Sequence, residues 1–268
     1  MDDPPAEDWA VGLLVIIGGG ALVAMGAGWY PDLEPGTWAQ WVGGFGTILA
    51  VLIALFGDLI RGRMFGPGLT VAVSLDPPDC VRVAAVYTYD FYRNSEFVSE
   101  EQGSVDTLYV RMRIGNFGRS LAREVQVFAE SVTTFDQAEG WRPVRMFPSM
   151  NLPWSDLPED SDVKLRMFFP GLGPTMSKHC DLGRIASPLH RYLIEDDRDD
   201  LDLKMNAFAF ETLVKPNHKG HIVGPGRYRI RLLLAAENAR PVVRTIELVV
   251  SPEWKPDDPA AMLAIRVV

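Results

Sequence analysis

Arginine side chains alternate with other residues in two segments of the chain. Arg227, Arg229 and Arg231 lie in one segment, and Arg111 and Arg113 lie in the other. Guanidinium groups bind phosphates and carboxylates through paired hydrogen bonds, so these five arginines are candidate ligand-binding residues. If the two segments form neighbouring strands, the arginines make one cationic stripe. The alternative is a solvated sheet face on which each arginine pairs with a nearby acid.

The other side chains that could bind a metal or act in catalysis form no recognisable motif. His218 and His221 lie in the sequence NHKGH, but neither a cysteine nor a carboxylate stands at ligand spacing, so we expect a surface loop rather than a metal site. His179 and Cys180 are adjacent in sequence, whereas a Cys-His nucleophile pair meets through the fold. The acidic run 195–202 lacks the glycine and terminal glutamate of a calcium loop. We therefore expect no cofactor and no enzymatic activity.

The net charge and the cysteine content argue against a nucleic-acid-binding protein and against a disulfide-stabilised one. The net charge is −9, and the acids exceed the bases both in residues 1–63 and in residues 64–268. An acidic domain has no global electrostatic attraction to nucleic acid, so we expect no direct nucleic-acid binding. Cys80 and Cys180 are too few for a disulfide framework, and we expect both to be small core residues with free thiols.

Two apolar stretches near the N-terminus predict transmembrane helices. Residues 10–28 and residues 39–57 contain no ionisable side chain, and each stretch is about as long as the roughly 20 residues that cross a bilayer. Trp9, Trp29, Trp38 and Trp41 lie at or near the ends of these stretches, as aromatic side chains do at membrane interfaces. We expect helices at about residues 10–29 and 39–60, joined as a hairpin in a transmembrane region 1–63.

The orientation of this hairpin follows from the charges beside it. Arg61 and Arg63 directly follow the second stretch, and the positive-inside bias places them in the cytoplasm. The residues before the first stretch are acidic, whereas the start of a cleaved signal peptide is basic. We therefore expect a multi-pass membrane protein, with the N-terminus and the domain 64–268 in the cytosol.

Small residues recur every four positions in both stretches. Gly20, Ala24 and Gly28 form one row, and Gly46, Ala50 and Ala54 form another. Such rows let helices approach closely in lipid. They predict either packing within one hairpin or assembly of several chains into a homo-oligomer, and the two can coexist.

Residues 64–268 show the period of two that is typical of half-buried strands. Apolar residues alternate in LTVAVSL from Leu69, LYVRMRI from Leu108, VKLRMFF from Val163, YRIRLLL from Tyr228 and TIELVV from Thr245. Turn signals such as GNFG, KPNHKG and GPG separate these runs. The segment from Ser187 is either a short helix or an acidic loop. We predict a mostly antiparallel all-β sandwich or an open barrel.

Two segments carry a resemblance. Gly115, Asn116, Phe117 and Gly118, followed by Ala122 and Val125, are similar to a strand-turn-strand of bacterial immunoglobulin-like domains. The second apolar stretch with its arginines, together with the late GPGRYRIRLLLAAENARPVVRTIELVVSPEW, resembles bacterial proteins that join an N-terminal helix hairpin to a cytosolic β-sandwich. Some of these are antiphage membrane effectors of retron or cyclic-oligonucleotide systems. The resemblance implies an immunoglobulin-like sandwich and a location in the bacterial inner membrane, and it carries no catalytic residues.

Two functions fit these features. In the first, the cytosolic domain senses a small anionic ligand or a protein partner, and the oligomerised helices then form a pore or otherwise disrupt the lipid bilayer. In the second, the hairpin is a passive anchor, and the β domain is a binding or scaffold module that holds a partner at the inner membrane.

Overall fold

The computed structural model describes residues 43–54, 65–93, 96–155 and 166–268, and the side chains of residues 88–102 lie outside the described part. By its internal contacts the chain divides into two compact units, Met1–Ile60 and Arg61–Val268. Each unit is described by itself.

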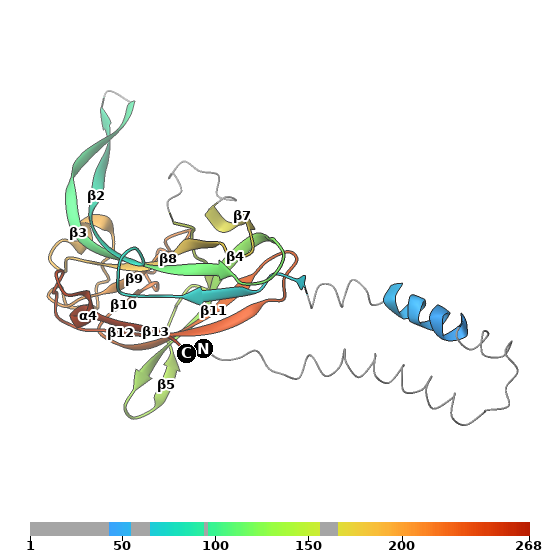
Figure 1. The fold of residues 1–268 in the computed structure, drawn as a ribbon. Coiled ribbons are helices and arrows are strands. Elements are labelled where there is room, and N and C mark those ends of the chain that lie inside the picture. The colour runs from blue at the N-terminus through green and yellow to red at the C-terminus, as the bar shows by residue number, and fades with distance from the viewer. Residues whose placement is uncertain (1–42, 55–64, 94–95, 156–165) are drawn as a thin grey trace, which may run out of the picture. The chain divides into compact units, whose positions relative to one another are not determined.

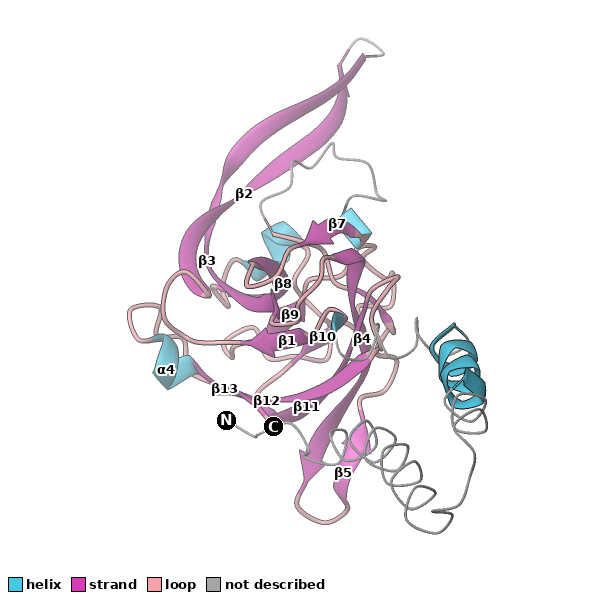
Figure 2. Ribbon diagram, turned by 45° about the vertical axis from the view of Figure 1, so that its right-hand side comes forward, coloured by secondary structure: helices cyan, strands magenta, loops and turns pink. Residues whose placement is uncertain are grey.

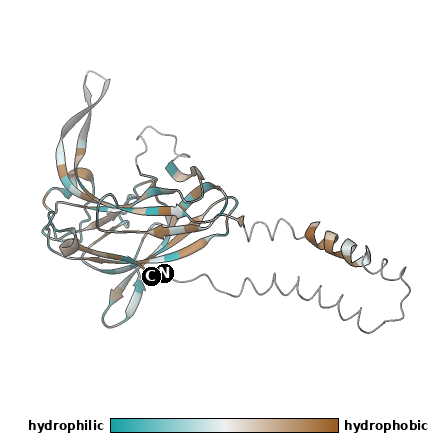
Figure 3. Cartoon of the chain, in the orientation of Figure 1, coloured by the Kyte–Doolittle hydropathy of each residue, from teal (hydrophilic) through white to brown (hydrophobic). Residues whose placement is uncertain are grey.

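The described part of the first unit is a helix of residues 43–54, drawn in white to brown hydrophobic colours in Figure 3. Gly46, Ala50 and Ala54 share one face of this helix, because four residues make slightly more than one turn, and all three are exposed. No helix among the described residues is long and apolar enough to cross a membrane. The expected helix 10–29, both ends of the expected helix 39–60, and the row Gly20, Ala24 and Gly28 lie outside the described residues.

The second unit is mostly antiparallel β structure in two sheets, which Figures 1 and 2 show as two layers. The first sheet contains β1 (Leu69–Ala72), β2 (Cys80–Arg93), β3 (Glu96–Asn116), β8 (Ser177–Ala186), β9 (Phe208–Phe210) and β10 (Ile222–Val223). The second contains β4 (Ala122–Asp136), β5 (Gly140–Pro143), β6 (Met150–Asn151), β7 (Phe169–Leu172), β11 (Gly226–Ala235), β12 (Val242–Val250) and β13 (Leu263–Val267). A 3-10 helix, η1 (Arg191–Ile194), and the short helix α4 (Pro259–Met262) connect strands.

The strand order determines which side chains become neighbours. The first sheet runs β1-β3-β8-β9-β10, with β2 also paired to β3; the second runs β13-β12-β11-β4-β5, with β6 and β7 also paired to β4. All of these pairings are antiparallel. The β2–β3 hairpin extends well beyond the rest of its sheet (Figure 1).

Alternating apolar residues from both sheets form one core, as the period of two predicts. Fully or largely buried members include Leu108, Val110, Met112 and Ile114 of β3, and Tyr228, Ile230, Leu232 and Leu234 of β11. The expected mostly antiparallel two-sheet β fold is therefore confirmed. Two local expectations had a different outcome: the strand predicted from Val163 is wrong for residues 166–168, since β7 begins at Phe169, and the segment from Ser187 contains both η1 and an acidic loop.

The GNFG motif lies where the chain passes from the first sheet to the second, because β3 ends at Asn116 and β4 begins at Ala122. A Cβ atom on Gly118 would lie 2.3 Å from the backbone nitrogen of Gly68, so this close approach admits only glycine. Ala122 and Val125 are buried in the core, as expected.

Candidate functional site

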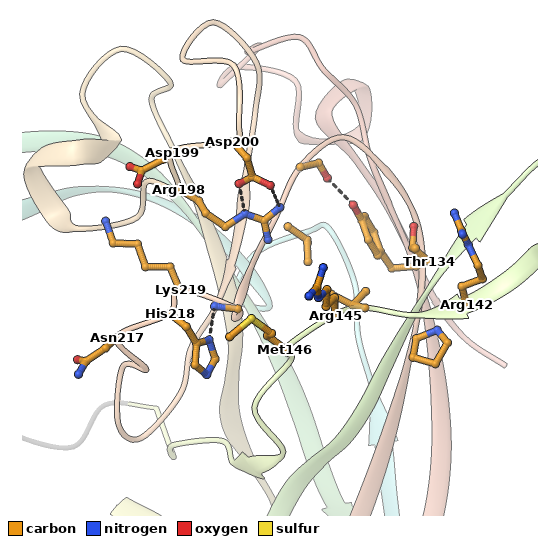
Figure 4. Close-up of a pocket in the computed structure, with 16 residues that line it drawn as sticks. Thr134, Arg142, Arg145, Met146, Arg198, Asp199, Asp200, Asn217, His218 and Lys219 are labelled. Carbon is orange, nitrogen blue, oxygen red and sulfur yellow. Dashed lines mark hydrogen bonds and ion pairs between the residues drawn. The ribbon is translucent and has the colours of Figure 1, made fainter.

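An open pocket of about 1130 Å³ lies where the second sheet meets three loops. Its lining includes Thr134 of β4, Tyr228 of β11, and residues 142–146, 198–200 and 217–220 (Figure 4). Pockets for small organic ligands have volumes of roughly 300–1,000 Å³, so this one has room for such a ligand.

Two of the lining loops meet through unusual backbone geometry. Met146 and Lys219 both have positive φ, 62° and 52°, which is uncommon for residues other than glycine. A Cβ atom on Gly220 would lie 2.0 Å from the carbonyl oxygen of Met146, so the two backbones touch there. Left-handed residues that persist in a fold often accompany functional sites, because the surrounding structure has to maintain them.

Four cations line the pocket, and two of them are already engaged. Arg198 donates to Asp200 from Nε at 2.5 Å and from Nη2 at 3.1 Å, and its Nη1 donates to the carbonyl oxygen of Ile222 at 2.8 Å (Figure 4). Arg142 donates to Asp136 and Glu139, both at 2.9 Å. These two guanidinium groups therefore help to hold their loops in place.

The side chains of the other two cations, Arg145 and Lys219, have no carboxylate or hydrogen-bond partner among the described residues. Arg145 is exposed and Lys219 is half-buried. They come from the two loops whose backbones touch at Met146 and Gly220.

Tyr228 forms an apolar part of the lining. Its ring is buried, and its hydroxyl donates to the carbonyl oxygen of Gly224 at 2.9 Å. Burial raises the pKa of this hydroxyl, so it stays protonated. Val144 and Val223 add further apolar surface. The pocket therefore combines an apolar wall with cationic loops.

Arg227 and Arg229 of β11 point away from the core and lie beside Glu247 of β12. Arg229 donates to its Oε1 from Nε at 2.9 Å and from Nη2 at 2.8 Å, and Arg266 of β13 donates to its Oε2 from Nε at 3.0 Å. Arg227 forms a third ion pair with this carboxylate at 3.5 Å. Bonds from Arg266 and then Arg229 lower the pKa of Glu247 to about 2. Trp141 of β5 stacks on this group, with the Arg229 guanidinium carbon 4.1 Å from its ring centroid.

The third β11 arginine, Arg231, pairs with Glu130 of β4 at 2.5 Å. All three arginines of β11 are thus engaged by acids of the neighbouring strands.

Arg111 and Arg113 of β3 lie in the other sheet. Arg111 pairs with Asp181 at 3.3 Å, and Arg113 lies 3.9 Å from Asp79, which also bonds His179 at 2.9 Å. Because β3 and β11 belong to different sheets, the five predicted arginines do not form one stripe. The arrangement seen is the alternative one, in which each arginine pairs with a nearby acid.

A buried charge cluster on β8 had no counterpart in the sequence analysis. Arg184 donates to Asp196 from Nε at 2.5 Å and from Nη2 at 2.8 Å, to Glu211 at 3.0 Å and to the Tyr109 hydroxyl at 3.2 Å. Burial opposes the charge on Arg184, but these partners outweigh it and raise its pKa. Burial likewise raises the pKa of Glu211 against the effect of Arg184. Breaking such a pair leaves an uncompensated buried charge, so the cluster links η1, β8 and β9 firmly.

The two histidines of NHKGH have different environments. His218 is exposed and its Nδ1 accepts the Gly220 N–H at 3.0 Å. His221 is only 3% exposed, and neither ring nitrogen has a hydrogen-bond partner in the described structure. Burial lowers the pKa of His221 to about 4, against the attraction of Asp196. The expectation of a surface loop holds for His218 and is wrong for His221.

Cys80 and Cys180 are buried free thiols, as expected. Burial raises the pKa of the Cys80 thiol to about 11 and that of Cys180 well above its usual value, so both are unreactive at neutral pH. Among the described residues, no group of three or more His, Cys, Asp or Glu side chains is placed to hold a metal ion.

No family model, curated protein or solved structure was found to match this chain.

Sequence reasoning missed the pocket because its residues come from separate loops. The available signal was the pair of basic turn segments, residues 142–145 and 215–221, each rich in proline or glycine and each ending a strand or preceding one. Only the packing of β4, β5, β10 and β11 brings them together.

Proposed function

We propose that this protein is a ligand sensor and effector of the bacterial inner membrane. The N-terminal hairpin spans the bilayer, and the β unit lies in the cytosol and binds a small anionic ligand or a partner. Binding changes the assembly of the helices in a homo-oligomer, and the helices then permeabilise the membrane. The immunoglobulin-like class of the sandwich and a role in antiphage defence belong to the same proposal and rest on the sequence resemblance.

The observation that supports this proposal is the pocket at residues 142–146, 198–200 and 217–220. It is large, open and lined by cations in a chain whose net charge is −9. A cationic pocket in an acidic protein concentrates anions locally, which is what a sensor of an anionic ligand needs.

A pair of glycine variants tests the effector step. Gly46→Leu blocks the small-residue face of helix 43–54, whereas Gly44→Leu places the same side chain about 200° around the helix. A Cβ atom at either glycine has open space within 4 Å, so neither change strains the described chain itself. Expressed in bacteria with a membrane-potential dye, wild type and Gly44→Leu should depolarise the cells, and Gly46→Leu should not. Equal behaviour of all three chains would remove the support for assembly through this face.

The edge of β2 favours the second function, a membrane-anchored binding module. Among the described residues no strand other than β3 pairs with β2, so its other edge is unpaired, and the side chains of Val83 and Val86 are exposed. Open strand edges bind extended peptides by adding a strand. For an anchor, deleting residues 1–62 should preserve partner binding and abolish only localisation, and Gly46→Leu should have no effect.

A further inference from the structure

We infer that the outer face of the second sheet docks on a bilayer surface that carries anionic phospholipid headgroups. The inference rests on the proposed function in one respect, since it takes the chain as anchored in a membrane that this face can reach.

The first step is a row of side chains that the strand register places next to one another on this face. Ala264 of β13 pairs with Val249 of β12, and Val249 pairs with Arg227 of β11. The Arg227 guanidinium carbon lies 5.7 Å from the centroid of the Phe135 ring, and Phe135 of β4 pairs with Trp141 of β5. Ala264, Val249 and Phe135 are exposed, and Trp141 is partly exposed. A mostly apolar row therefore crosses the sheet from β13 to β5.

The second step is an excess of positive charge beside this row. Three arginines, Arg227, Arg229 and Arg266, form ion pairs with the single carboxylate of Glu247. Their side chains are 46%, 40% and 69% exposed, whereas that of Glu247 is 5% exposed. Each guanidinium group has about five N–H donors and a carboxylate accepts at about four positions, so Glu247 leaves most of these donors unused. The group presents arginine, and not glutamate, to the outside.

The other acids of this face do not cancel that excess. Glu130 pairs with Arg231 at 2.5 Å, so this pair adds no net charge. At the turn between β4 and β5, Arg142 pairs with Asp136 and Glu139, which leaves one negative charge there. The three arginines around one carboxylate of β12 outweigh it, and they lie beside the apolar row.

The third step is the choice of occupant. Aromatic rings settle at the level of lipid headgroups, and arginine stems lie along apolar surface while the guanidinium group stays in the polar layer. The core of a stable protein interface is depleted of charge, whereas here Arg227 lies within the apolar row, between Val249 and Phe135. A membrane anchor keeps this face at a high local concentration near the bilayer, so weak contacts with anionic headgroups are sufficient.

The test uses the full chain in lipid nanodiscs, with a fluorophore on the cysteine of an Ala264→Cys variant. Cys80 and Cys180 are both buried, so the introduced thiol is the accessible one. Discs of phosphatidylcholine are compared with discs of equal parts phosphatidylcholine and phosphatidylglycerol, each with a trace of lipid that carries a quencher on its headgroup. The label should be quenched more strongly in the anionic discs, and high salt should reduce this quenching. A label at Leu203→Cys, exposed on a loop outside the second sheet, should show no increase in the anionic discs.

A pair of double variants tests the arginines. Arg227→Gln with Arg266→Gln removes two positive charges, while Arg229 keeps its bonds to the carboxylate. The ratio of docked to undocked chain in anionic discs should fall about thirtyfold, because each arginine near an anionic surface contributes roughly a fivefold factor. The matched control is Arg123→Gln with Arg240→Gln, which makes the same charge change at exposed positions away from the row and should dock like wild type. A thermal melt of each variant establishes that it is folded.

Two outcomes would overturn the inference directly. One is equal quenching of the Ala264 label in both kinds of disc, which is the result expected if the occupant of this face is an acidic protein. The other is an equal loss of docking in the control pair, since total charge alone would then explain the effect.

Failure of this inference is distinct from failure of the proposed function. If cells depolarise in a Gly46-dependent way but the label is quenched equally in both discs, docking is wrong and the effector role stands. If the label is quenched through Arg227 and Arg266 and no chain depolarises cells, the inference stands and the effector role is wrong. A chain that enters neither kind of disc would overturn the membrane anchor and this inference with it.

Discussion

The side chain of Asn116 should be one of the largest single contributors to stability outside the hydrophobic core. It is fully buried between the two sheets and makes four hydrogen bonds to the backbone. Its Oδ1 accepts the N–H groups of Gly68 and Gly118, both at 3.0 Å. Its Nδ2 donates to the carbonyl oxygens of Ser120 and Leu172, both at 2.8 Å. One side chain thus joins the segment before β1, the crossover from β3 to β4, and β7.

Asn116→Ala removes all four bonds while the backbone groups stay buried. A hydrogen bond contributes a net of about 0.5–1.5 kcal/mol, and a buried group left without a partner costs more, so the loss should be about 4 kcal/mol. In a domain of this size 1 kcal/mol shifts the melting temperature by about 2–4 °C, which gives a decrease of about 12 °C. The measurement is thermal unfolding of the full chain in detergent, followed by near-ultraviolet circular dichroism.

Asn238→Ala is the matched control. Its side chain also links two backbone groups, accepting from the Arg123 N–H at 3.0 Å and donating to the Leu121 carbonyl oxygen at 2.8 Å, but this site is exposed. Water replaces those bonds, so the loss should be below about 1 kcal/mol. If Asn116→Ala melts within about 3 °C of the Asn238→Ala chain, burial is not what makes the Asn116 bonds valuable, and the reasoning is wrong.

Three further changes have defined outcomes. Gly220→Ala places a Cβ atom 2.0 Å from the Met146 carbonyl oxygen and should lower the free energy of urea unfolding by about 1–3 kcal/mol. Gly224→Ala should lower it less, because the Cβ atom there meets only the movable end of the Leu201 side chain, and equal losses would contradict the Gly220 contact. In wild type the free energy of unfolding should fall as the pH drops from 6.5 to about 4, because only the unfolded chain protonates His221 in that range. His221→Phe should make this fall smaller, and an unchanged pH profile would show that His221 is solvated. Between pH 4.5 and about 2 the folded Glu247 carboxylate stays charged while the unfolded one takes up a proton, so wild type loses stability as the pH falls through this range. Glu247→Gln should lack this part of the pH dependence in acid unfolding curves, and curves that coincide with wild type would show that the arginines around Glu247 do not stabilise its charge.

The sequence predicts the β class well because burial of one face imposes a period of two on each strand. The alternating residues of β3 and β11 are the core residues, and the isolated cysteines are buried thiols. The sequence pattern does not predict strand partners, since alternation looks the same in either sheet. For that reason the two arginine segments could be recognised as exposed strand faces, but their assignment to different sheets could not be derived.

The candidate pocket illustrates the same limit more strongly. By itself the sequence determined that Arg111, Arg113, Arg227, Arg229 and Arg231 face away from the core, and that a turn with basic residues, KPNHKG, lies at residues 215–220. Only the tertiary structure decided that the arginines are matched to acids on neighbouring strands, and that Arg145 and Lys219 are left without such partners in the described structure. The physical reason is that pairing depends on distances of a few ångströms between segments far apart in sequence, and those distances are set by strand order and packing.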